Sequence, residues 1–232
     1  PDLQSAEEAV TFARELHALC VFLGVTGGVM QKGHMRFEPN VNVVMTLEDG
    51  SEVATPIAEV KNLNSFRAIK GAIEYESKRQ VEQWKKDGVE MGPGRKATFG
   101  WDPEKMRTIL QRSKEDAHDY RYFPEPDLVP LRVDQGWRDQ VRSRLPELPQ
   151  ARRQRYTGIY GLPEKDAKAL VADPNFCFFY EEAIENVSSE AAHATAKLLL
   201  NTAAKIANEH NTTVPELGVS PQQVAALVEL RA

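Results

Sequence analysis

The segment from residue 36 to residue 61 constrains the fold most strongly, because its apolar side chains alternate with polar ones. The apolar set on one face of residues 36–47 is Phe37, Val41, Val43, Met45 and Leu47. A period of two predicts a strand with one buried face. Residues 48–51 read as a tight turn, so a second strand ending near Lys61 should complete a hairpin. Pro39 places the first strand at a sheet edge or a bulge.

Helices are predicted on both sides of this hairpin. Before it, Ser5 and Glu8 form a capping-box pattern, and the apolar stripe that follows is Phe12, Leu16, Leu19 and Leu23. After it, residues 65–87 carry apolar residues at helical spacing and end at Gly88. A further extended segment is expected around residues 107–114.

Charged and amide side chains concentrate where the second strand becomes the long helix. Glu59 and Lys61 are two residues apart, so on a strand they project from one face. Asn62, Asn64 and Ser65 follow at the turn. One interpretation is a site where a carboxylate, an ammonium and amides meet a charged ligand. The other is a surface ion pair followed by helix-capping Asn and Ser.

From Pro146 onward the pattern becomes helical. Helices are expected over residues 150–156, 164–171, 176–184 and 189–209, with another beginning at Pro221. We therefore predict two domains, residues 1–145 and 146–232. The basic run Arg152, Arg153 and Arg155 has two interpretations, contacts with nucleic-acid phosphates or a solvated helix face.

Composition narrows the class of protein. The 232 residues carry a net charge of −5, which argues against nonspecific nucleic-acid binding as the main role. Cys20 and Cys177 lie in apolar helical contexts without metal-ligand spacing, so buried thiols are expected. No apolar run approaches the roughly 20 residues that cross a bilayer. We expect no membrane association and a cytoplasmic location, with an organelle as the alternative.

Three blocks of sequence resemble one enzyme family. They are MQKGHMRFEPNVN at residues 30–42, AEVKNLNSFRAIKGAIEYESKRQ at 58–80, and RSKEDAHDYRYFPEPDLVPL at 112–131. In this order they resemble the B subunits of the tRNA-dependent aspartyl/glutamyl amidotransferases. The chain begins at Pro1 and ends at Ala232 inside patterns that continue in the family. We therefore expect a fragment that lacks the first part of the catalytic domain and the tail after the helical domain. His34, Phe37 and Glu38 depart from the residues common in the family.

The resemblance implies an α+β fold, with a mainly antiparallel sheet of the glutamine-synthetase-like type and helices, followed by an all-α domain. It also implies an activity. ATP would phosphorylate the side-chain carboxylate of misacylated Glu-tRNA(Gln) or Asp-tRNA(Asn), and ammonia would replace the phosphate. The implied partners are an A subunit that supplies ammonia from glutamine, a small C subunit and the misacylated tRNA. The competing hypothesis is a noncatalytic module for tRNA binding or subunit assembly.

The same resemblance assigns roles to individual residues. Glu38 and Glu59 are the candidate ligands of Mg²⁺ or of its bound water. The candidate ATP-binding residues are Asn40, Lys61 and Arg121. The candidate catalytic residues are Lys61, Asn62, Asn64, Asp119 and Arg121.

Overall fold

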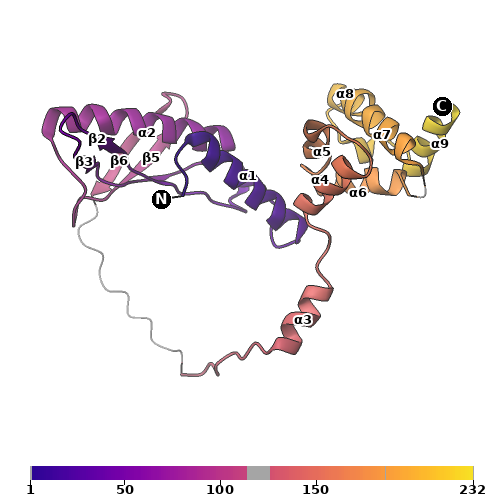
Figure 1. Cartoon of the computed structure of the whole chain (residues 1–232), viewed down its shortest axis with the longest axis horizontal. Coiled ribbons are helices and arrows are strands. Elements are labelled where there is room, and N and C mark those ends of the chain that lie inside the picture. The colour runs from indigo at the N-terminus through magenta and orange to yellow at the C-terminus, as the bar shows by residue number, and fades with distance from the viewer. Residues whose placement is uncertain (1, 114–125, 186, 232) are drawn as a thin grey trace. The chain divides into compact units, whose positions relative to one another are not determined.

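The computed structural model describes residues 2–113, 126–185 and 187–231. The chain forms two compact units: residues 1–17 with 27–133, and residues 18–26 with 134–232. The first unit combines a sheet with helices and the second is helical (Figure 1), so the predicted α+β class is confirmed. None of the described helices is long and apolar enough to cross a membrane.

The main sheet of the first unit has the strand order β1-β4-β5-β6. The strands are β1 (Asn40–Val41), β4 (Ala58–Lys61), β5 (Ala97–Asp102) and β6 (Arg107–Ser113). β1–β4 and β5–β6 are antiparallel and β4–β5 is parallel. As expected of a strand next to Pro39, β1 lies at the edge. A separate hairpin joins β2 (Val44–Thr46) to β3 (Glu52–Ala54) through the predicted turn.

Helix α2 (Phe66–Asp87) covers one face of this sheet (Figure 1). It begins at Ser65, whose side chain accepts a hydrogen bond from the Ala68 N–H, and it ends at Gly88 in the left-handed conformation. The core between helix and sheet contains Val60, Ile69, Ala72 and Trp101, all at most 4% exposed.

The predicted strand over residues 36–47 has the expected burial pattern but is divided between two sheets. Val41 is buried, and Val43, Met45 and Leu47 are partly buried while their neighbours are exposed. Between β1 and β2 the backbone bonds to side chains. The Gln80 amide donates to Val41 O (3.0 Å), and Val43 N donates to Thr55 Oγ1 (2.8 Å). With the backbone bond from Thr55 N to Val43 O (2.9 Å), they hold the chain where the strand divides.

A buried carboxylate connects α2 to the strands. Glu76 is fully buried and accepts bonds from Arg79 Nε (2.9 Å), Arg79 Nη2 (2.7 Å) and Gln80 Nε2 (3.0 Å). The Thr108 hydroxyl on β6 donates to the same carboxylate. Arg79 also lies over the Phe99 ring of β5, 4.5 Å from its centroid. The Thr55 hydroxyl donates to Gln80 Oε1 at 2.5 Å, and Thr55 with these residues forms the Glu76 network.

Helix α1 (Ala6–Phe22) begins where its capping residues predict, but it buries a different face from the one expected. Glu8 N donates to Ser5 Oγ at 3.1 Å. Phe12, placed on the predicted apolar stripe, is 54% exposed, whereas Ala13 is buried in the core of the first unit. The prediction followed the large apolar side chains, whereas a small residue, Ala13, packs into the core.

The second unit consists of short helices around one apolar core. These are α4 (Pro149–Gly158), α5 (Glu164–Leu170), α6 (Pro174–Ala183), α7 (Ser189–Lys197), a π-helical turn η2 (Leu198–Ala203), α8 (Ala204–Glu209) and α9 (Pro221–Arg231). α3 (Gln135–Ser143) precedes them and was not predicted. Buried Tyr156, Leu170, Cys177 and Tyr180 form part of the core. Cys177 is a buried free thiol, as expected; Cys20 is free and only partly buried.

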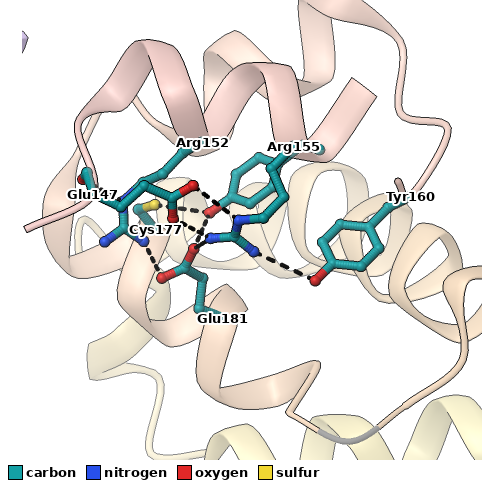
Figure 2. Close-up of polar contacts among 7 residues, drawn as sticks. Glu147, Arg152, Arg155, Tyr160, Cys177 and Glu181 are labelled. Carbon is teal, nitrogen blue, oxygen red and sulfur yellow. Dashed lines mark hydrogen bonds and ion pairs between the residues drawn. The ribbon is translucent and has the colours of Figure 1, made fainter. Parts of the chain in front are cut away.

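The basic run on α4 is part of a partly buried ion-pair cluster, and neither sequence interpretation holds for Arg152, which is buried. Arg152 and Arg155 both donate to Glu181 of α6 (Figure 2). Arg155 also bonds both oxygens of Glu147, at 3.0 and 2.6 Å. Arg152 is only 6% exposed. These guanidinium groups join α6 and the segment before α4, and neither presents a free charge to phosphate.

The Glu76 network predicts a strong effect of Gln80→Leu. The substitution leaves the Val41 carbonyl without its side-chain donor and the Thr55 hydroxyl without its acceptor in a buried place, so we expect a loss of about 2 kcal/mol or more in the free energy of unfolding. Denaturant unfolding followed by tryptophan fluorescence measures it. The control is Gln83→Leu, three residues further along α2, where the exposed amide bonds only Asp87. A loss no greater than the control's would show that the network contributes little.

The helical cluster predicts a pH-dependent contribution from Glu147. Its hydrogen bonds with Arg155 lower the pKa of this carboxyl below the ordinary 4.5. The stabilisation is therefore complete above pH 4.5 and is lost as pH falls through the lower folded-state pKa. We expect Glu147→Gln to be less stable than wild type at neutral pH.

The stability difference between wild type and Glu147→Gln should close in acid, which urea unfolding at a series of pH values would measure. Glu164→Gln, at an exposed pair with Lys168, serves as the control and should show a small difference throughout. A Glu147→Gln difference that does not change with pH would contradict this account.

Candidate functional site

The candidate site is the sheet face turned away from α2. Asn40 of β1 pairs with Glu59 of β4, so by the antiparallel register Glu38 lies across from Lys61. Because side chains alternate along a strand, these four residues lie on the face opposite Val60, which is buried against α2. We call Glu38, Asn40, Glu59 and Lys61 the polar face.

Two carboxylates converge on one ammonium in this face. Lys61 Nζ lies 2.7 Å from Glu38 Oε2 and 3.0 Å from Glu59 Oε1. Hydrogen bonds to Glu38 first and Glu59 second raise the pKa of Lys61 above its ordinary value, so the ammonium stays charged at neutral pH. The Glu59 side chain is 12% exposed, against about a third for Lys61 and Glu38. Glu38 and Glu59 thus meet at one ammonium, that of Lys61.

Lys96 is a member of this cluster that the sequence did not reveal. Its Nζ lies 3.3 Å from Glu59 Oε2, so the two oxygens of Glu59 each face an ammonium. Lys96 precedes β5, which is parallel to β4 and was itself not predicted. Only a prediction of the strand at residues 97–102 could have placed Lys96 beside Glu59. The four charges balance within the cluster.

A buried hydroxyl lies in the next strand of the same row. Thr98 of β5 pairs in register with Glu59, which places both side chains on the polar face. Thr98 is 2% exposed, and its Oγ1 has no hydrogen-bond partner in the described parts of the chain. Unpaired buried hydroxyls are uncommon and are often found at functional sites. Thr98 therefore offers a hydrogen-bonding group next to Glu59 that the described residues do not use.

Of the predicted amides, Asn62 has a structural role in the turn after β4. Asn62 has a φ of 64°, in the left-handed region that Asn tolerates, and its Nδ2 donates to Trp101 O at 3.4 Å. It therefore turns the chain between β4 and α2. Asn64 is exposed. Asn64 was one candidate for the cap of α2, and the residue that caps the helix is Ser65. The catalytic roles of Asn62 and Asn64 stay predictions.

Asp119 and Arg121 lie outside the described residues, so their predicted roles stay predictions. Among the residues that the structure does describe, no group of three or more His, Cys, Asp or Glu side chains could hold a metal ion. Glu38 and Glu59 offer oxygens of the type that Mg²⁺ prefers, but each contacts an ammonium. The donor set fits a cation in part, since both carboxylates point to one place and that place attracts positive charge.

Comparison with known proteins places this sheet in a defined family. Residues 1–139 match the family model described as the GatB/GatE catalytic domain. This match includes the whole polar face and α2.

Several curated proteins are similar over nearly the whole chain. The B subunit of the aspartyl/glutamyl-tRNA(Asn/Gln) amidotransferase of Cupriavidus metallidurans is 40% identical over 228 residues, which are 98% of this chain and 46% of that protein. The proteins of the same name from Ralstonia nicotianae and Geotalea daltonii are 41% and 40% identical, over 98% and 99% of this chain and 45% and 46% of their own lengths. The chain thus spans about half the length of these relatives. On the family match over more than half of its residues, the chain belongs to the GatB/GatE catalytic-domain family.

Proposed function

We propose that this chain is part of the B subunit of a glutamine-dependent amidotransferase that acts on misacylated tRNA. The reaction would convert Glu-tRNA(Gln) to Gln-tRNA(Gln), or Asp-tRNA(Asn) to Asn-tRNA(Asn). The observation that carries the proposal is the convergence of Glu38 and Glu59 on Lys61, inside the matched domain and on the sheet face away from α2. The relatives' names supply the substrate class.

The chemistry gives the polar face a specific task. A carboxylate is a poor electrophile, so transfer of the ATP γ-phosphoryl group to it makes phosphate the leaving group that ammonia displaces. This transfer needs positive charge held against the phosphate oxygens. Lys61 is our candidate for that contact, with Arg121 as a second and Asn40 orienting the nucleotide. Asn62, Asn64 and Asp119 are proposed to position the reacting groups.

Glu38 and Glu59 are proposed to hold Mg²⁺ or its bound water when nucleotide is present. Magnesium would neutralise charge on the phosphates. The structural reason is the position of the two carboxylates, which already share one cation, Lys61. Glu59 also keeps a second cationic contact, Lys96, at 3.3 Å.

The remaining proposals concern partners and place. An A subunit would supply ammonia from glutamine, and a C subunit would complete the complex. The location would be cytoplasmic. The competing hypothesis is a noncatalytic module for tRNA binding or subunit assembly. Of the three arginines proposed for tRNA phosphates, Arg152 and Arg155 are paired with Glu181.

The test is Lys61→Met in the full-length subunit within its complex. Removing an ammonium from the phosphate site should lower ATP-dependent phosphorylation of misacylated tRNA roughly 100-fold or more, as loss of one preorganised electrostatic contact does elsewhere. Glu59→Gln should have a similar effect. Glutamine hydrolysis in the A subunit should stay near its normal rate. Phosphate release and glutaminase activity are the two measurements.

Lys70→Met is the matched control. Lys70 also joins two carboxylates, Glu7 at 2.5 Å and Glu74 at 3.7 Å, but it lies on α2 and outside the polar face. Its phosphorylation rate should equal that of wild type. If Lys61→Met keeps the normal rate but weakens tRNA binding or complex assembly, the noncatalytic hypothesis replaces ours.

A further inference from the structure

A β-bulge between β5 and β6 adds one residue to the polar face. Arg112 pairs with Thr98 and Leu110 with Phe99, so Gln111 is an extra residue on β6. In such a bulge two consecutive residues oppose one on the partner strand, and bulges near active sites often redirect a side chain. Gln111 is exposed.

Gly100 fixes where this side chain lies. A Cβ built on Gly100 would be 2.5 Å from Gln111 Nε2 and 3.2 Å from its Cδ, so the Gln111 amide rests directly over Gly100. Gly100 pairs in register with Lys61 of β4. Because paired residues of neighbouring strands share a face, the amide lies on the same face as Lys61, one strand away. Only a residue without Cβ leaves this space.

We propose that Gln111 is a ligand-contacting residue of the candidate site and that its amide N–H group donates a hydrogen bond to a phosphate oxygen of bound ATP. The inference rests on the proposed function, since it names a further contact at the same site. An exposed amide has two N–H donors, and Lys61, the proposed phosphate contact of the site, lies one strand away on the same face. Gly100 is the positioning residue, because only a residue without a Cβ leaves room for the amide at this place.

The two roles predict an unusual mutational pattern. Gln111→Leu removes the donors. Gly100→Ala displaces the amide at little structural cost, because the atoms it meets belong to the end of a flexible side chain. Each should raise the KM for ATP about tenfold, the effect of one hydrogen bond to a charged group. Thermal stability and the KM for misacylated tRNA should not change.

The double variant makes the test specific. If Gly100→Ala acts by moving Gln111, then Gly100→Ala with Gln111→Leu should equal either single variant and the effects should not add. Gln111→Glu should raise the KM for ATP further, because its charge repels phosphate. Gly92→Ala and Gln83→Leu are matched controls: a Cβ at Gly92 would meet Arg95 at an ordinary 3.6 Å, and Gln83 is exposed on α2.

Two outcomes would overturn the inference. The first is a normal KM for ATP in both single variants while Lys61→Met still abolishes phosphorylation, which would leave the proposed function intact. The second is additive effects in the double variant, which would mean that Gly100 and Gln111 act independently. A normal phosphorylation rate in Lys61→Met would instead count against the proposed function itself.

Discussion

The burial of one acidic side chain constrains the arrangement of the first unit. A buried polar group costs free energy unless it is hydrogen-bonded, and Arg79, Gln80 and Thr108 supply donors to Glu76. Those donors come from α2 and β6, so the helix can lie in one position against the sheet. Gln80 then extends the network to Val41 of β1, the strand beside Glu38. The buried network thus reaches the strand that follows a residue of the candidate site.

Local patterns predicted the elements well and their partners poorly. The alternation over residues 36–47 gave the correct burial, and Ser65 and Gly88 bounded α2 as their cap signals indicate. The division of that strand depends on Gln80, 39 residues from Val41. No local pattern carries that information. Similarly, β5 was missed, and with it Lys96, because its identity as a strand comes from pairing in parallel with β4.

The candidate site shows the same division between local and distant information. Glu59 and Lys61 share a face by strand period alone, and the sequence indicated this. The arginines of α4 looked equally suited to phosphate, yet Arg155 bonds Glu147, 8 residues away, and Glu181, 26 residues away. A basic run in sequence is therefore evidence of a surface charge only after its acidic neighbours in space are known. Asn62 is a related case, since its left-handed φ and its bond to Trp101 account for an amide at that position.

Charge balance explains why the polar face suits the proposed chemistry. Glu38 and Glu59 together match Lys61 and Lys96, so the cluster is neutral as it stands. A lone phosphate would bring excess negative charge to Glu59, which is largely buried, and a lone metal ion would have to displace the ammonium. A nucleotide with its metal ion carries both signs. Under the proposed function, its metal ion would take the carboxylates and its phosphate the ammonium groups, so that Glu59 would not be left unpaired. The proposal therefore implies that nucleotide and metal ion would bind together.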